Sequence, residues 1–147
     1  MAKITHIFKT YFPETSGGLE EAIRQYAGLA RQKGFDVDII SVASQPYSLT
    51  AHDGSKVHFF QKTFDLVSNP FSFSLALAFK KIVQSTDILH FHFPWPTAEL
   101  LVLLHHIRKP CLVTFHCDIH KIKPLKKIYQ PCIRRYLKKM DKICISS

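Results

Sequence analysis

No run of apolar residues in this sequence is long enough to cross a lipid bilayer. The 147 residues are 46% hydrophobic, but no apolar stretch approaches the ~20 residues that a membrane-spanning helix needs. The opening residues, MAKITHIFKT, are interrupted by Lys3, His6 and Lys9, which argues against a signal peptide. The chain is long enough to fill one hydrophobic core. We therefore expect a single domain that is soluble or peripheral to a membrane.

Cysteine is sparse and lacks the spacing of a metal site. No two of the four cysteines form a C-x-x-C pair, and no zinc-type spacing is present. We therefore expect a reduced, cytoplasmic protein. The cysteines are Cys111, Cys117, Cys132 and Cys144.

Two catalytic fingerprints are also missing. The sequence has no G-x-G-x-x-G motif, so a nicotinamide or flavin dehydrogenase loses its main support. It has no G-x-S-x-G turn for a Ser-His-Asp hydrolase, and Cys117 has no obvious partner for a cysteine hydrolase. These absences disfavour a Rossmann-like nucleotide enzyme of those classes.

The net positive charge of the chain is concentrated in one segment. The net charge is +9, and +8 of it lies between residues 121 and 142, where nine lysines and arginines face only Asp141. The basic character is therefore local.

Strand and helix patterns alternate along the chain. Short runs rich in β-branched and aromatic residues are followed by apolar residues at helical spacing, and Gly34 is a natural stop for the first helix. This alternation predicts a Rossmann-like three-layer α/β domain with a mostly parallel sheet and helices on both faces. The expected strands cover 4–12, 35–43, 56–64, 87–93, 111–116 and 142–146, and the expected helices cover 19–30, 71–84, 97–107 and 124–140.

Paired glycines follow the first expected strand. Gly17 and Gly18 lack a Cβ and precede a helix whose first amides are free, a combination that suits a diphosphate. The same dipeptide can also be a plain turn. Glu20 and Glu21 fall in the first helical turn, where they must face away from a phosphate or bind sugar hydroxyls.

His90 and His92 alternate along one strand and so face the same side of it. Such an arrangement could provide two metal ligands. However, no carboxylate lies within six residues after His92, and we expect no metal site. The aromatic residues of the segment HFHFPWP are expected to form the wall of a carbohydrate or lipid pocket.

His116 ends the strand CLVTFH and therefore stands at the carboxyl edge of the sheet. Open parallel sheets bind ligands at that edge. A histidine there can take part in chemistry or fill a structural position, and the residues alone leave both open.

The basic helix expected at 124–140 is amphipathic. Its apolar stripe should pack on the sheet, and its basic face should attract an acidic surface such as anionic lipid, at ~1 kcal/mol for each nearby cation. Pro124 suits the first turn, whereas Pro131 should kink or divide the helix. The stripe consists of Leu125, Ile128, Tyr129, Cys132, Ile133, Tyr136, Leu137 and Met140, and the basic face of Lys126, Lys127, Arg134, Arg135, Lys138 and Lys139.

Four segments, in order along nearly the whole chain, resemble the N-terminal domain of family 4 (group 1) glycosyltransferases of the GT-B fold. The resemblance rests on a Gly-Gly-x-Glu loop after the first strand, a His-x-Pro-like segment after a central strand and a Thr-Phe-His strand end. The segments are ITHIFKTYFPETSGGLEEAIRQYAGLARQKGFDVDIISV, DILHFHFPWPTAEL, LVTFHCDIHK and MDKICISS.

The resemblance implies a retaining transferase that moves a sugar from a nucleotide-diphosphate donor to a saccharide or lipid-linked acceptor, with no metal or other cofactor. Gly17 and Gly18 would lie near the donor diphosphate and the acceptor. Glu20 and His92 would belong to the same site, and His116 would approach the transferred sugar.

Family members also carry a second Rossmann-like domain that binds the donor nucleotide, and we expect residues 1–147 to lack it. On this interpretation the chain is a truncated acceptor-side domain that is inactive alone, with a cytoplasmic location or one at the inner face of the plasma membrane. The alternative is a stand-alone basic module that binds nucleic acid or another acidic polymer. The absence of a base-stacking motif weakens the nucleic-acid version.

Overall fold

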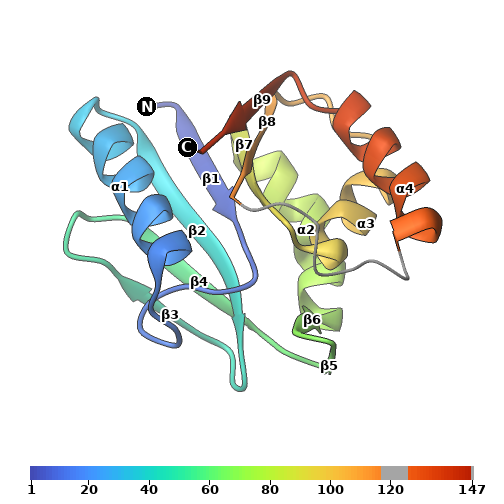
Figure 1. The fold of residues 1–147 in the computed structure, drawn as a ribbon. Coiled ribbons are helices and arrows are strands. Elements are labelled where there is room, and N and C mark those ends of the chain that lie inside the picture. Colours follow the sequence, from blue (N-terminus) through green and yellow to red (C-terminus); the bar gives the residue numbers. More distant parts are fainter. Residues whose placement is uncertain (117–125, 147) are drawn as a thin grey trace.

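One seven-stranded sheet organises the chain (Figure 1). The computed structural model describes residues 1–116 and 126–146. The strand order is β3-β4-β2-β1-β7-β8-β9, and every neighbouring pair is parallel except β3 and β4. Without β3 this is the order of a doubly wound dinucleotide-binding sheet, which confirms the predicted Rossmann-like α/β class. The strands are β1 (Lys3–Ile7), β2 (Asp36–Ala43), β3 (Tyr47–Thr50), β4 (Lys56–Gln61), β7 (Ile88–Phe93), β8 (Cys111–Phe115) and β9 (Lys142–Ile145).

Helices cover both faces of the sheet, as predicted. In Figure 1 one helix, α1, lies apart from the other three, which gather on the opposite side of the sheet. Two hydrophobic clusters correspond to these faces: Ile23 of α1 packs with Ile39, whereas Phe79 of α2 packs with Phe91. The helices are α1 (Gly18–Gln32), α2 (Phe73–Ser85), α3 (Pro96–Leu104) and α4 (Lys126–Lys138), and a hairpin of β5 (Phe64–Leu66) and β6 (Asn69–Phe71) precedes α2.

The central strand β7 divides its side chains between the two faces. Leu89, Phe91 and Phe93 belong to the cluster under α2, α3 and α4. Because side chains alternate along a strand, His90 and His92 point to the face that carries α1. This division places a row of polar rings on one side of the sheet.

The first strand is shorter than expected. β1 ends at Ile7, so the prediction of a strand over 4–12 is wrong beyond that residue. Phe8 and Tyr11 resemble strand residues because they are apolar, but they are buried in the cluster with α1 as part of the following loop. Tertiary packing therefore explains their hydrophobicity without a strand.

Three short strands were not predicted from the sequence. β3 makes an antiparallel edge on β4, and β5 pairs with β6 around Val67 and Ser68, which have positive φ values of 52° and 61°. Asn69 and Pro70 belong to β6. Strands this short bury little surface, so their sequences carry no clear alternation.

Helix α4 departs from the expected pattern in two ways. Pro131 was predicted to kink or divide the helix; it lies inside one continuous helix, so it does not divide it. The residue is exposed, and water can reach the carbonyl that a proline leaves without a donor. Ile128 is 76% exposed and Cys132 is exposed, because they lie on the flank of a stripe whose centre is marked by Ile133 and Tyr136. Pro124, Leu125 and the side chain of Lys126 lie outside the described residues.

No helix within the two described ranges has both the length and the apolar composition needed to cross a membrane.

Candidate functional site at the carboxyl edge of the sheet

The parallel strands β1, β7 and β8 are neighbours, so their carboxyl ends meet at one edge of the sheet. The chain turns to one side after β1 and to the other after β7, which makes this edge a topological switch point. Doubly wound sheets bind ligands at such points. The paired glycines follow β1, and His116 follows β8, as predicted.

The glycine loop forms the start of α1. Gly17 is the residue that caps the helix, and Gly18 is its first residue; Gly17 has no side chain and gives the first turn no cap hydrogen bond. Gly17 has an extended backbone, and the glycines of the described chain with φ in the left-handed region are Gly34 and Gly54. The loop therefore presents a helix start that its N-cap residue leaves uncapped, an arrangement that favours an anion.

The two glycines have different surroundings. A Cβ on Gly17 would lie 3.0 Å from Oε2 of Glu20, whereas a Cβ on Gly18 would meet nothing within 4 Å. Gly17 thus permits a close approach of the Glu20 carboxylate. Gly18 borders open space beside the amides.

The two glutamates of the first turn are held in place by other side chains. Glu20 is buried and accepts a 2.7 Å hydrogen bond from Thr15 Oγ1. Burial alone would raise the pKa of Glu20, but hydrogen bonds from Thr15, its own backbone and Thr10 bring the pKa below its usual value. Glu21 accepts bonds from Arg24 and Gln25, which lower its pKa to about 2. Glu20 therefore organises the loop, and Glu21 is paired along the helix surface.

Four histidines gather on the α1 side of the sheet. The register pairs His6 of β1 with His90 of β7, and His92 with Thr114 of β8. His90 and His92 are stacked with ring centroids 4.4 Å apart, so the prediction that they share one face is confirmed. His6 and His92 are each only 2% exposed, and His116 is half-buried.

Three of these rings are joined nitrogen to nitrogen. His6 Nδ1 lies 3.1 Å from His92 Nε2, and His92 Nδ1 lies 2.8 Å from His116 Nε2. We call His6, His92 and His116 the histidine run. His90 stands beside the run and bonds Thr114 Oγ1 at 2.8 Å instead. Two of the predicted site residues, His92 and His116, are thus brought into direct contact.

Burial lowers the pKa of all four imidazoles. The pKa values of His6 and His92 lie well below the ordinary value, first because burial disfavours the charged form and then because neighbouring imidazoles repel a further charge. The pKa of His90 falls to about 4 through burial and His116, and burial lowers that of His116. At neutral pH the cluster is therefore uncharged.

Three ring nitrogens of the cluster lie close enough to one another that a metal site must be considered. His6, His90 and His92 each offer one, and these atoms lie within 4.8 Å of one another. However, stacked rings do not aim their in-plane lone pairs at a common point, and among the described residues no carboxylate hydrogen-bonds to the cluster. A divalent ion there would be buried without a counter-charge.

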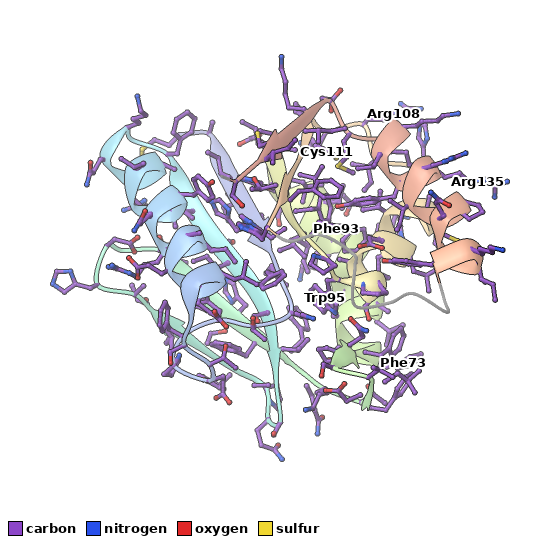
Figure 2. All side chains as sticks on the ribbon, viewed as in Figure 1. Phe73, Phe93, Trp95, Arg108, Cys111 and Arg135 are labelled. Carbon is purple, nitrogen blue, oxygen red and sulfur yellow. The ribbon has the colours of Figure 1, made fainter. Side chains whose placement is uncertain are left out.

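The aromatic segment that begins in β7 and runs into α3, residues 90–96, does not form a pocket wall. Phe91, Phe93 and Trp95 are buried in the cluster under α2, α3 and α4, so that prediction is wrong; Figure 2 labels Phe93 and Trp95. Trp95 Nε1 donates a 2.9 Å hydrogen bond to the carbonyl of Pro70. The aromatic residues point away from the α1 face because they occupy alternate positions to the histidines.

Two buried polar residues were missed from the sequence. His6 could have been found from its place on the first strand beside the histidine-bearing strand. Glu99, in the first turn of α3, is 3% exposed, and its Oε2 has no hydrogen-bond partner in the part of the chain that the structure describes. Burial raises the pKa of Glu99 to about 8 despite a hydrogen bond from the Trp95 amide and the charge of Lys9. A lone carboxylate in an otherwise apolar helix was the signal.

A groove of about 880 Å³ opens on the outer flank of α1. It lies between that helix, the loop after β1 and the turn between β3 and β4. Its lining combines aromatic rings with polar groups, and it was not predicted because three separate segments supply it. The residues include Tyr11, Phe12, Arg24, Gln25, His52 and Asp53.

Residues 16–147 match the model of a protein family described as Glycosyltransferase Family 4. This chain belongs to glycosyltransferase family 4. The assignment confirms the resemblance drawn from the glycine loop and the histidine segments.

Curated relatives of this family 4 chain include the D-rhamnosyltransferase WbpZ of Pseudomonas aeruginosa, 33% identical over 146 residues, which cover 99% of this chain and 38% of the relative. The O-antigen chain mannosyltransferase C of Escherichia coli is 34% identical over 146 residues, covering 99% and 39% respectively. The chain therefore spans less than two fifths of the length of these relatives.

A sucrose-phosphate synthase from Thermosynechococcus elongatus has a similar solved structure. Its TM-score is 0.67 at 13% identity, and the match covers all of this chain and 43% of that one. At this identity the likeness supports the fold and no finer statement.

The family 4 chain also exposes a basic surface on α4. The side chains of Lys127, Arg134, Arg135 and Lys138 are exposed, and Figure 2 shows Arg135 on the outer side of this helix. The ammonium group of Lys139 is engaged within the molecule: its Nζ donates hydrogen bonds to the carbonyls of Val102 and His105 at the end of α3, at 3.2 and 3.4 Å. Cys117 lies outside the described residues.

Proposed function

We propose that this chain is the acceptor-side domain of a retaining glycosyltransferase. The complete enzyme would move a sugar from a nucleotide-diphosphate donor to a saccharide or lipid-linked acceptor of the cell-envelope polysaccharide type. The observation that carries this proposal is the meeting of the glycine loop and His116 at one sheet edge in a family 4 chain. The names of the two bacterial relatives, a rhamnosyltransferase and an O-antigen mannosyltransferase, support a polysaccharide product.

Each residue of the site has a role in this proposal. The amides that follow Gly17 and the open space at Gly18 would receive the donor diphosphate. Glu20 would hold the loop in shape through Thr15. His116 would meet the transferred sugar, with His92 behind it, and no metal or other cofactor would be required.

The groove beside α1 supports a saccharide acceptor. Aromatic rings such as Tyr11 and Phe12 offer apolar faces, and Arg24, Gln25 and Asp53 offer hydrogen-bonding groups to hydroxyls. Sugars present both kinds of surface. The groove borders the loop that also carries the paired glycines, so an acceptor lying in it would reach the proposed site.

We further propose that transfer requires the part of the relatives that this chain does not span. A donor nucleotide would bind there, opposite the glycine loop. The family assignment favours this interpretation over a stand-alone module that binds nucleic acid or an acidic polymer.

A chimera tests the proposal. The matching segment of the E. coli mannosyltransferase would be replaced by this chain, and sugar transfer to that enzyme's acceptor would be measured. We expect transfer by the chimera, at least a hundredfold loss for its His116→Ala variant, and little change for His106→Ala, which alters an exposed histidine.

The 147-residue chain alone should show no transfer. Turnover of a nucleotide sugar by the chain alone would contradict the proposed dependence on a second part. A folded chimera that is inactive, or one unaffected by His116→Ala, would contradict the proposed site.

The α4 surface supports a location at the inner face of an anionic membrane. Besides its cations, this side of the molecule exposes Ile128 of α4 and Leu104 of α3, which are 76% and 70% exposed. Cations beside exposed apolar side chains match a negatively charged lipid surface. This proposal is independent of the transfer chemistry.

Liposome flotation tests the membrane proposal. We expect the chain to float with vesicles that contain anionic lipid, and the Arg134→Glu/Arg135→Glu variant to lose this binding. The matched control is Lys33→Glu/Lys56→Glu, which changes two exposed cations elsewhere. Equal binding to neutral and anionic vesicles, or equal loss in both variants, would count against a lipid-facing α4.

A further inference from the structure

The middle ring of the histidine run uses both of its nitrogens. His92 Nε2 faces His6 Nδ1, and His92 Nδ1 faces His116 Nε2. A neutral imidazole carries one N–H and one lone pair. His92 can therefore donate to one neighbour only while it accepts from the other, so the proton position on any one ring fixes the positions on the other two.

Only two arrangements of protons satisfy both hydrogen bonds when the rings are neutral. In the inward arrangement, His116 donates from Nε2, His92 donates from Nε2, and His6 carries its proton on Nε2. In the outward arrangement, His6 donates from Nδ1, His92 donates from Nδ1, and His116 carries its proton on Nδ1.

The buried end of the run distinguishes the two arrangements. His6 Nε2 is buried, and within the described chain it has no hydrogen-bond partner. The inward arrangement would leave an N–H there without an acceptor, and orphaned N–H groups are rare in protein interiors. The outward arrangement leaves only a lone pair at that position. At the other end, His116 is half-buried, and its Nδ1 makes no hydrogen bond within the described ranges.

We propose that His6 and His92 are positioning residues, which hold His116 as the Nδ1–H tautomer and so present a hydrogen-bond donor at the carboxyl edge of the sheet. An Nδ1–H there can donate to a sugar hydroxyl or a phosphate oxygen, both of which accept. The benefit of this donor to sugar transfer rests on the function proposed above. The arrangement of protons on the three rings does not depend on that function.

The low pKa values of these rings support the neutral state that the proposal requires. Burial lowers the pKa of His6, His92 and His116. The carboxylates and cations on the elements around them do not hydrogen-bond to the run within the described residues. Measurements at pH 8 would therefore observe uncharged rings.

Nuclear magnetic resonance of the 147-residue chain tests the proposal without any substrate. Long-range ¹H–¹⁵N correlation spectra identify which nitrogen of each histidine carries the proton, and couplings across N–H···N bonds show which rings are joined. We expect both bonds of the run and His116 with its proton on Nδ1. A wild-type His116 with its proton on Nε2 would overturn the proposal.

Two substitutions at His6 form a matched pair, because the side-chain amide of asparagine and the carboxylate of aspartate place an atom near the position of Nδ1. His6→Asn can still donate to His92, so His116 should keep the Nδ1–H form. His6→Asp can only accept when ionised, so His116 should change to the Nε2–H form. A folded His6→Asp variant with an unchanged His116 would overturn the role of His6.

Thr114→Val provides the control beside the run. It removes the hydrogen bond to His90 alone and should leave the His116 tautomer unchanged. One equivalent of Zn²⁺ should leave the couplings intact; their loss would mean that these rings bind metal, which would overturn the proposal. An inactive chimera with the expected tautomer would count against the proposed function only.

Discussion

At the scale of single residues, the two adjacent glycines differ in what surrounds them. A Cβ on Gly17 would press against Glu20 Oε2 at 3.0 Å, and that carboxylate is buried and tied to Thr15. We expect Gly17→Ala to lower the free energy of unfolding by about 0.5–1 kcal/mol. Gly18→Ala, in open space at the first helical residue, should raise it by up to about 1 kcal/mol. Chemical denaturation measures both, and equal stabilisation by the two changes would contradict the contact argument.

Glu99 is a single residue with a measurable effect on stability at alkaline pH. Its pKa is raised to about 8 by burial, so as pH rises the folded chain must either keep a proton that the unfolded chain has released or lose it and bury a charge. We expect Glu99→Gln to increase the free energy of unfolding by about 1–3 kcal/mol at pH 9 and to change it little at pH 5.

Urea denaturation at the two pH values checks this expectation for Glu99. Glu21→Gln removes the same formal charge from a half-buried position on the surface of α1, where the pKa is lowered and not raised, and should give no alkaline gain. The same gain from both variants would show that net charge, and not burial, is responsible.

At the scale of elements, the buried face of α4 contains fewer residues than the apolar stripe predicted from its sequence. Ile133 is 7% exposed and belongs to the core, whereas Ile128 is 76% exposed. We expect Ile133→Ala to cost about 2–4 kcal/mol and Ile128→Ala to change stability by less than about 0.5 kcal/mol. Thermal or chemical unfolding of the two variants checks the expectation. Similar losses would mean that α4 packs through a different face.

At the scale of the whole molecule, two sets of buried groups set opposite limits on stability. Folding lowers the pKa values of four histidines: His6, His90, His92 and His116. Below about pH 6.5 the unfolded chain therefore binds more protons than the folded chain, and the free energy of unfolding decreases as pH falls. Folding raises the pKa of Glu99 from 4.5 to about 8. Between these two pH values the folded chain binds more protons than the unfolded chain, so the free energy of unfolding decreases as pH rises from 4.5 to about 8.

The free energy of unfolding should therefore be greatest near about pH 7. A series of denaturation curves from pH 4 to pH 9 measures this profile. In Glu99→Gln the loss of stability that Glu99 causes as pH rises from about 4.5 to about 8 should disappear. The maximum should therefore move toward alkaline pH, and the rise in stability between about pH 5 and pH 7 should be steeper than in the wild type. An acid side that is flat between pH 5 and pH 7 would contradict the buried, neutral state of the histidines.

Much of the fold was predictable because it depends on periodic patterns. The helical spacing from Leu19 to Ala30 and the stop at Gly34 match α1, and the apolar runs match the parallel strands. The prediction was wrong where a residue is apolar for another reason. Phe8 and Tyr11 pack under α1 from a loop, and Trp95 fills the core although its segment suggested a pocket wall.

The sequence by itself determined the class of sheet, the family and the places where Gly17, Gly18, His92 and His116 stand, because these depend on local pattern and on the order of elements along the chain. Only the tertiary structure decided which of them touch. His6 and His92 are 86 residues apart, and strand register alone makes them neighbours. Likewise, burial in the folded chain, and not its place in the sequence, raises the pKa of Glu99 to about 8.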